Sequence, residues 1–316
     1  MNVLDTAIRV LSMMAYAIPG FLFVKTKTLS ASQISPFSKV LVYLCQPCLE
    51  IHAFLSADCT PELLSAMGWF FLLCTGVQLL VLGAVCLLPG DRGEICRRVS
   101  GAAAVFGNVG FIGIPLLEAL LPPEVAPDAV ALSAVFALSM NILAWTAGLF
   151  LITGEKKHIR AKGLLLNPAM LAFYVAFPLF LAGFKMPEAL GTAVSLAGKM
   201  STPLCMIALG MRLAATPFRR IVTDKFAWFS CLGKLLLMPL LALLCVKLLS
   251  FVYPFPWYFG ATLFLLCCCP TAAVVQNFSE IYLPESQTAG KHTAADAILL
   301  SNLLCMLSIP LLAALL

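Results

Sequence analysis

Charged side chains are scarce in this chain of 316 residues: 15 acidic and 20 basic residues make up only 11% of it. A soluble domain of ordinary composition carries about 25% charged residues. Apolar residues take their place, forming 61% of the chain and giving a mean hydropathy of +1.00. Because so few polar side chains could not cover the surface of two soluble domains, the composition predicts a polytopic membrane protein.

Catalytic signatures are also missing. Only three histidines occur (His52, His158 and His292), and there is neither an HExxH sequence nor a GxxxxGK[ST] nucleotide loop. Most of the 13 cysteines lie in apolar stretches, where a cysteine behaves as a small hydrophobic residue. No basic run is long enough for nucleic-acid binding. The sequence therefore predicts a protein that is not an enzyme and that binds no metal, no other cofactor and no nucleic acid.

Ten apolar stretches are long enough to cross a bilayer, for which an α-helix needs about 20 residues. The first lacks a basic leader and a small-residue cleavage site, so we expect it to be retained as a span. We predict the spans at residues 4–24, 37–56, 63–88, 101–121, 129–152, 164–184, 189–211, 224–250, 256–278 and 294–316.

Basic residues are concentrated in alternate loops between these spans. The central loop 153–163 contains Lys156, Lys157, Arg160 and Lys162, whereas the loops on either side of its flanking spans contain almost no lysine or arginine. Lys and Arg in short loops mark the cytoplasmic side of a membrane. We therefore expect a multi-pass protein of the cell membrane (inner or plasma membrane) with its N- and C-termini outside.

Five spans lie on each side of the central loop, in residues 1–152 and 164–316, so the two halves must enter the membrane in opposite senses. Matching residues recur in the two halves at nearly equal offsets: Pro47 with Pro203, Pro115 with Pro270, and Asn141 with Asn302. Inverted repeats with interrupted helices are typical of secondary transporters, which bind their substrate where the interruptions meet. The predicted fold is therefore all-α, with ten transmembrane helices in two inverted five-helix repeats.

The most informative interruption is the segment from Gly107 to Pro115 in the fourth span. Its repeated glycines and its proline weaken the hydrogen bonds of the helix. Backbone groups freed in this way must be buried in protein or must line a wet cavity. A second interruption lies at Cys269, Pro270 and Thr271 in the ninth span. We favour a binding site where the two interruptions meet over a merely kinked pair of packing helices.

Five segments in order carry a resemblance to a known family: GNVGFIGIPLLEAL, LLNPAM, TPLCMIALGMRLA, CCPTAAVVQNFSEIYLPES and SIPLLAALL. Through them the chain resembles the auxin efflux carrier family, which includes the plant PIN proteins and bacterial carboxylate permeases. The first segment has the family's step of seven residues from Asn108 to Pro115, and the fourth is similar to its proline-broken ninth helix.

The resemblance implies a fold in which the first, second, sixth and seventh spans form a scaffold and the other six form a mobile transport domain. The scaffold would dimerise through the second and seventh spans, and the broken fourth and ninth spans would cross at Pro115 and Pro270. The resemblance also implies an elevator movement and a small organic anion, such as a mono- or dicarboxylate, as substrate. The expected partners are this anion, the lipid bilayer and a second copy of the chain.

Residues near the interruptions are candidates for binding the anion. A half-helix that begins beside the crossing presents free N–H groups and the positive end of its dipole to a carboxylate. The Asn108 side chain could add a donor, or it could cap the freed backbone instead. Asn141 on the next span could also donate, or it could pair with a neighbouring helix. The candidate substrate-binding residues around the two asparagines are Gly110, Pro115, Pro270 and Thr271.

Ionisable residues at membrane depth are functional candidates because it is costly to leave them unpaired in lipid. We predict that Glu50 and Lys199, on the pseudo-symmetric spans 37–56 and 189–211, face one another across the substrate path. A structural ion pair is the alternative. His52 lies on the same span as Glu50, and either residue could also carry a proton.

Two other charges lie within predicted spans. Lys234, in the middle of the eighth span, could act directly or could extend its long side chain toward water. Asp296, at the start of the tenth span, is expected to be solvated or to serve as a charge at a helix N-terminus.

Two alternatives stay open beside the anion permease. A sodium-coupled organic-anion symporter of the bile-acid type would share the crossed helices, although nothing in the sequence identifies a sodium site. A receptor or scaffold with a transporter-like body is the other, and the short loops without a soluble signalling domain argue against it. Sodium-dependent uptake would separate the first alternative from the permease.

Overall fold

The computed structural model describes residues 3–87, 95–251 and 254–316, and their regular structure is helical apart from one isolated β-bridge. Six helical runs within these residues are long and apolar enough to cross a membrane: Val3–Lys25, Pro61–Leu87, Ala126–Thr153, Glu188–Ala215, Lys225–Ser250 and Thr288–Ala313. Three shorter apolar helices are Val109–Leu120, Pro168–Leu181 and Trp257–Cys268. The all-helical, multi-span character predicted from the sequence is confirmed.

The helices follow one another with few long connections. The α-helices are α1 (Val3–Met14), α2 (Ala17–Lys25), α3 (Ile34–Val40), α4 (Gln46–Leu55), α5 (Pro61–Leu87), α6 (Ile95–Val105), α7 (Ile114–Leu120), α8 (Ala126–Leu143), α9 (Leu149–Thr153), α10 (Ala161–Leu165), α11 (Pro168–Leu181), α12 (Glu188–Lys199), α13 (Ser201–Ala215), α14 (Phe218–Thr223), α15 (Lys225–Leu232), α16 (Met238–Ser250), α17 (Trp257–Cys268), α18 (Val274–Tyr282) and α19 (Thr288–Ala313). The π-helical turns are η2 (Leu41–Cys45), η3 (Val109–Gly113), η4 (Ala144–Gly148) and η6 (Gly233–Leu237). The short 3₁₀ turns are η1 (Ala31–Gln33) and η5 (Lys156–His158). The span predicted at 37–56 lies in the continuous run of α3, η2 and α4.

Three of the π-helical turns end two residues before a proline. The turn η2 precedes Pro47, η3 precedes Pro115 and η6 precedes Pro239. Proline has no N–H to donate, and its ring clashes with the carbonyl four residues earlier. A π-turn adds one residue to the helical ring and is often found at functional sites. The wider turn therefore lets each of these helices continue through its proline.

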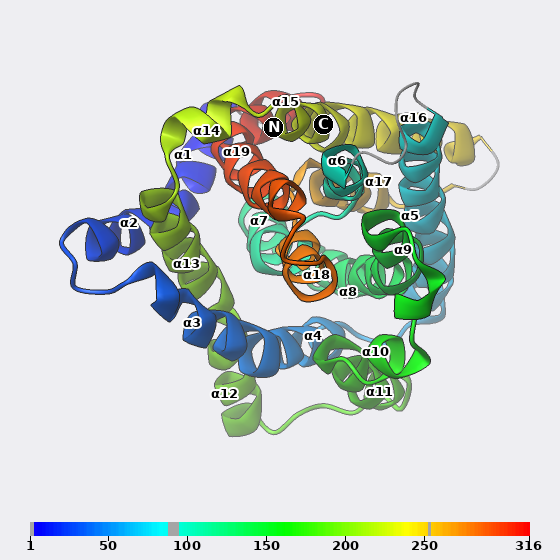
Figure 1. Ribbon diagram of the computed structural model, residues 1–316. Coiled ribbons are helices and arrows are strands. Elements are labelled where there is room, and N and C mark those ends of the chain that lie inside the picture. Colours follow the sequence, from blue (N-terminus) through cyan, green and yellow to red (C-terminus); the bar gives the residue numbers. More distant parts are fainter. Residues whose placement is uncertain (1–2, 88–94, 252–253) are drawn as a thin grey trace.

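The helices form two packed groups, which can be followed in Figure 1. In one group α2 packs on α13, and α4 packs on α11 and α12. In the other group α5 packs on α8, α16 on α17, and α19 on α6, α15 and α18. The contact of α2 with α13 is made by backbone, because a Cβ atom on Gly20 or Gly210 would overlap a carbonyl of the facing helix. Only glycine lets two helices approach this closely.

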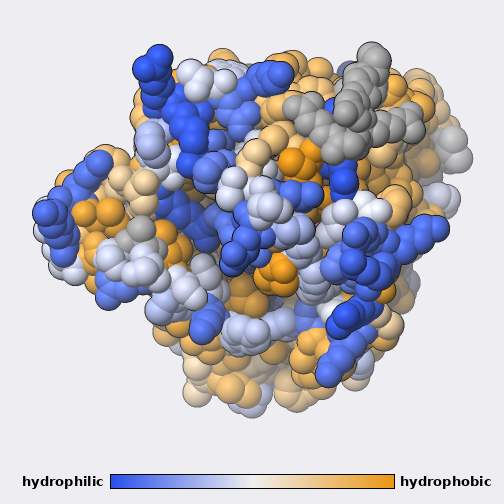
Figure 2. Space-filling view, in the orientation of Figure 1, coloured by the Kyte–Doolittle hydropathy of each residue, from blue (hydrophilic) through white to orange (hydrophobic). Residues whose placement is uncertain are grey.

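The outward faces of the molecule carry large apolar side chains. Leu72, Leu248 and Leu311 are each more than half exposed. Figure 2 shows hydrophilic residues spread over the end that faces the viewer, with hydrophobic residues around the rim. An exposed apolar rim of this kind belongs against lipid, where the hydrophobic effect does not penalise it.

Candidate functional site

Two helices are interrupted, and their interruptions meet. The chain leaves helical conformation between α6 and η3, and again between α17 and α18. The Asn108 N–H donates to the Pro270 carbonyl over 2.7 Å. Beside this bond, Gly107 and Thr271 form an isolated antiparallel bridge. The two non-helical segments therefore satisfy each other's backbone groups inside the protein, as an interruption at membrane depth requires.

The crossing lies at a different residue of the fourth span from the one predicted. Pro115 lies inside the continuous helix Val109–Leu120, two residues after the π-turn η3 that accommodates it. The extended chain is at Gly107 instead, and a Cβ there would lie 2.6 Å from the Nζ of Lys234. A side chain at this point would therefore have to displace the buried end of Lys234. In the ninth span the interruption does include Pro270, as predicted.

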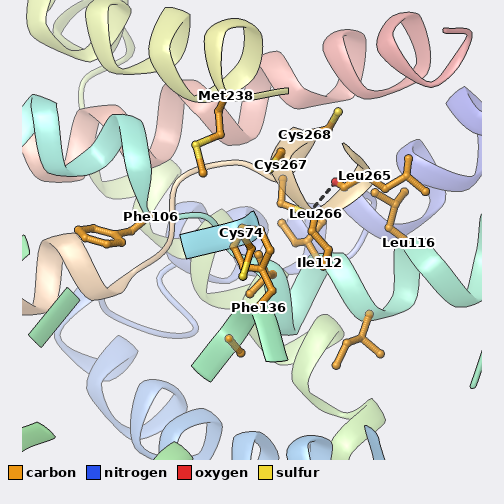
Figure 3. Close-up of a cluster of buried hydrophobic side chains, with 14 of the residues drawn as sticks. Cys74, Phe106, Ile112, Leu116, Phe136, Met238, Leu265, Leu266, Cys267 and Cys268 are labelled. Carbon is orange, nitrogen blue, oxygen red and sulfur yellow. Dashed lines mark hydrogen bonds between the residues drawn. The ribbon is translucent and has the colours of Figure 1, made fainter. Parts of the chain in front are cut away.

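The crossing is surrounded by apolar packing. Cys267, Cys268 and Cys269 are all 0% exposed. Figure 3 shows Cys267 and Cys268 in one cluster with Ile112 and Met238, which come from η3 and α16. The cysteines pack as small apolar residues at a tight helix crossing, which is the role the sequence indicated for them.

Thr271 uses both of its donors inside the crossing. Its N–H donates to the Ser301 hydroxyl over 3.1 Å, and its own hydroxyl donates to the Ala103 carbonyl over 2.9 Å. The residue is only 1% exposed. Thr271 therefore fixes α6 and α19 to the crossing, and the structure does not bring it to a cavity.

The asparagines differ in their surroundings. The Asn108 side-chain oxygen accepts from the Phe111 N–H over 3.3 Å and so caps η3, which was the alternative role considered for it. Its amide nitrogen lies 3.6 Å from the Cys205 sulfur on α13. Asn141 on α8 is half-buried, and no described residue hydrogen-bonds to its side chain. Substrate contact by either asparagine stays a prediction.

A cavity of about 250 Å³ lies between the two groups of helices. Its lining comes from the α1–α2 corner, α4, α7, the end of α12 and the start of α13: Tyr16, Leu49, His52, Ile114, Pro115, Glu118, Lys199, Ser201, Thr202 and Pro203. Thr202 also donates its hydroxyl to the Phe111 carbonyl over 2.7 Å, which ties α13 to η3. Gly110, the remaining glycine predicted for the site, faces Leu49, and a Cβ there would lie 3.7 Å from Leu49 Cδ2.

The cavity brings together three predicted site residues: His52, Pro115 and Lys199. It adds Glu118, which the sequence reasoning missed. Glu118 Oε1 lies 3.9 Å from His52 Nε2, and Lys199 acts on the same carboxyl group electrostatically. Glu118 comes three residues after Pro115, and residues at this spacing share a helix face, which is the signal that could have found it.

The structure does not place Glu50 opposite Lys199 across the cavity, as predicted, and does not pair them, which was the alternative. Among the described residues no ion pair joins these two side chains; Glu50 is 7% exposed and does not line the cavity. The reason is helical geometry, since residues two apart on a helix do not face the same way. His52 faces the cavity and Glu50 therefore turns away from it. Glu118 takes the place of Glu50 as the carboxylate near Lys199.

At the other end of α13 polar side chains connect the two groups of helices. The Arg212 guanidinium donates to the Gln276 side-chain oxygen on α18. Arg220 on α14 makes a bidentate pair with Asp296 on α19, at 2.9 to 3.1 Å. Asp296 is 1% exposed and lies beyond the first turn of α19, so it has neither of the roles expected for it, a solvated carboxylate or a charge at a helix N-terminus. These contacts tie α13–α14 to α18–α19 at the end of α13 opposite the cavity.

The apolar helices and the paired interruptions define the class of this protein: it is a polytopic membrane protein with a cavity lined by both apolar and charged side chains. Comparison with protein families gives its identity at the family level. The family model described as "Membrane transport protein", the transport domain of the auxin efflux carrier family, matches residues 3–313, so the chain belongs to this family. No curated protein matches the chain significantly.

Proposed function

We propose that the chain is a secondary transporter for a small organic anion, such as a mono- or dicarboxylate, that binds in the cavity beside α7 and the α12–α13 junction. The observation that carries the proposal is the placement of Lys199 and His52 in one cavity with the interrupted helix of a transport family. The chemistry is binding and release, and we propose no enzymatic reaction.

The charges of the cavity suit an anion that must also leave. Lys199 supplies one full positive charge, and protonation of His52 would add a second. Glu118 offsets part of this charge, with its carboxylate 3.9 Å from His52. With Glu118 ionised, the three side chains sum to zero when His52 is neutral and to one positive unit when it is protonated. Lys199 and a protonated His52 can still attract a carboxylate locally, and partial exposure to solvent keeps the attraction to a few kcal/mol. An anion would therefore be held without being trapped.

The movement we propose is an elevator movement of one helix group against the other. The fold would be ten spans in two inverted repeats, residues 1–152 and 164–316, joined by the loop 153–163. The scaffold would be built from α1–α4 and α11–α13, and the remaining long helices would form the mobile domain. Support comes from the packing, since α2, α4, α11, α12 and α13 contact one another while α5, α6, α8 and α15–α19 pack among themselves. The cavity lies between the first set and α7, which packs on α8 of the second set.

We place the protein in the cell membrane, with both termini outside, as the basic loops indicate. A homodimer would form through the second and seventh spans. Tyr43 on η2 and Leu196 on α12 support this surface, since they are 71% and 61% exposed and apolar. A second copy of the chain could cover them.

The first test is a thermal-unfolding screen of the purified protein against mono- and dicarboxylates, followed by uptake of the best ligand into proteoliposomes. The proposal expects a ligand that raises Tm and that is taken up faster than by protein-free vesicles. Asn108→Ala, which removes the cap of η3, should weaken both signals. If no carboxylate raises Tm and none is taken up, the proposed function is wrong.

Lys199→Gln tests the cavity itself. We expect the ligand to bind about tenfold more weakly, which corresponds to about 1.4 kcal/mol of lost attraction. The matched control is Lys247→Gln on α16, an exposed lysine in an apolar helix outside the cavity. If wild type and Lys199→Gln bind the ligand with equal affinity, the ligand does not bind in this cavity. Uptake that requires sodium would favour the bile-acid type of symporter instead.

A further inference from the structure

Lys234 is a lysine without access to water, placed at the helix crossing. It lies in the π-helical turn η6, and its side chain is 0% exposed, among the largest fully buried side chains of the described residues. Its ammonium donates to the Cys267 carbonyl over 3.3 Å. The long side chain does not reach toward water, which was one of the two roles expected for it. It points into the crossing.

No carboxylate among the described residues is paired with this charge. The Lys234 ammonium donates to the Cys267 carbonyl, and the ionisable groups that act on it electrostatically are the thiols of Cys267, Cys268 and Cys269. A buried charge without a partner is costly, so something other than a carboxylate has to stabilise it.

The ends of two helices lie beside the ammonium. The helix α17 ends at Cys268, and Cys267, whose carbonyl accepts from Lys234, is in its last turn. The helix α6 ends at Val105, and a Cβ on Gly107, two residues further on, would lie 2.6 Å from the Lys234 nitrogen. The C-terminal end of a helix carries the negative end of its dipole and carbonyls without helical donors. The C-terminal end of α17 therefore points its negative charge at the ammonium group, and the chain that leaves the end of α6 lies against the same group.

Helix ends and unwound carbonyls of this kind are what coordinates a coupling cation in transporters with broken helices. We propose that the Lys234 ammonium is a built-in cation at this crossing, which occupies the position that a bound cation such as sodium would need and stabilises the C-terminal end of α17. The assignment of Lys234 as this cation rests on its burial, its hydrogen bond to Cys267 and its contact with Gly107. Its consequence for coupling, that transport needs no sodium, rests on the proposed carrier function.

The test measures the thermal unfolding of purified variants. Lys234→Met keeps the length and apolar bulk of the side chain and removes the charge, so we expect Tm to fall by about 5 °C or more. Lys234→Ala leaves a space with the shape of the missing fragment, which is n-propylammonium. Millimolar n-propylammonium should raise the Tm of Lys234→Ala and leave that of the wild type unchanged. Tetramethylammonium, which has the charge but not the shape, should have little effect.

Lys247→Met and Lys247→Ala are the matched controls, because Lys247 lies on α16, the helix that continues from η6, and is exposed. Neither should respond to n-propylammonium. The proposal is overturned if Lys234→Met unfolds at the wild-type temperature or above it. It is also overturned if no small cation, n-propylammonium or sodium, stabilises Lys234→Ala more than the wild type. Should Lys234→Ala fail to fold, the result for Lys234→Met decides.

The coupling consequence has its own readout. Uptake by wild-type proteoliposomes should be unchanged when choline replaces sodium on both sides. A loss of uptake in choline would contradict the coupling claim, even if the Tm results support the cation site. If no anion is taken up under any condition, the proposed function fails, and the Tm results still decide whether Lys234 is the built-in cation.

Discussion

The helix crossing and the cavity are close neighbours with opposite characters. At the crossing the polar groups bond within the protein: Asn108 with Pro270, and Thr271 with Ser301 and Ala103. In the cavity Glu118, His52 and Lys199 are incompletely paired and at least partly exposed. Saturated polar groups give rigidity, whereas unsaturated charges are free to bind a ligand. The comparison indicates that changes at the crossing should act on stability, and changes in the cavity on binding.

The largest expected effect is on the packing of the crossing. Gly107→Ala would place a methyl group 2.6 Å from the buried end of Lys234. Overpacking of this kind costs about 1–3 kcal/mol, so Tm should fall by several degrees. The control is Gly110→Ala, whose Cβ would make an ordinary contact 3.7 Å from Leu49. If the two variants unfold at the same temperature, the crossing is less tightly packed than described here.

A smaller effect should follow the loss of one hydrogen bond at the crossing. Thr271→Val keeps the shape and removes the hydroxyl that donates to Ala103, which should cost about 1 kcal/mol of unfolding free energy. Thr262 on α17 provides the control, because its buried hydroxyl has no partner among the described residues. Thr262→Val should leave Tm unchanged or raise it. A larger loss in Thr262→Val than in Thr271→Val would contradict the comparison.

The smallest effect on stability, but a clear one on binding, is expected in the cavity. Glu118→Gln removes the negative charge that opposes an anion, so ligand affinity should rise about threefold. Stability should change by less than ~1 kcal/mol, because the Glu118 side chain is 33% exposed and its pairing is screened. Titration of the best carboxylate ligand measures the affinity, and Glu62→Gln at the exposed start of α5 is the control. Weaker binding in Glu118→Gln would show that this carboxyl group assists the ligand.

Composition and span length predicted the all-helical membrane fold, because both depend on the bilayer and not on tertiary contacts. The meeting of the two interruptions could also be predicted, from Gly107 to Pro115 and from Pro270. The exact crossing point could not. A proline is visible in the sequence, whereas the π-turn that accommodates Pro115 and the ammonium that lies against Gly107 are features of the packed structure.

The carboxylate of the cavity was misassigned for a related reason. The depth of a residue along a span can be counted from the sequence, and Glu50 was chosen as a candidate on this basis. The direction in which a side chain points around the helix depends on the packed structure, and there His52 and Glu118 line the cavity. Asp296 was likewise expected in solvent or at a helix N-terminus, because its partner Arg220 is distant in the chain and only the fold brings the two together.

The π-turn η3 has a consequence for how this helix can change in evolution. A π-turn contains one residue more than an α-turn, and each residue of an α-helix adds about 100° of rotation. Deleting a single residue between Val109 and Gly113 would leave a regular helix that still spans the same depth. Because the wider turn had already absorbed the rotation of that residue, every side chain beyond it, Glu118 included, would keep nearly the same direction. This helix could therefore lose one amino acid without moving the acid that it presents to the cavity, and what it would lose is the wider turn that accommodates Pro115.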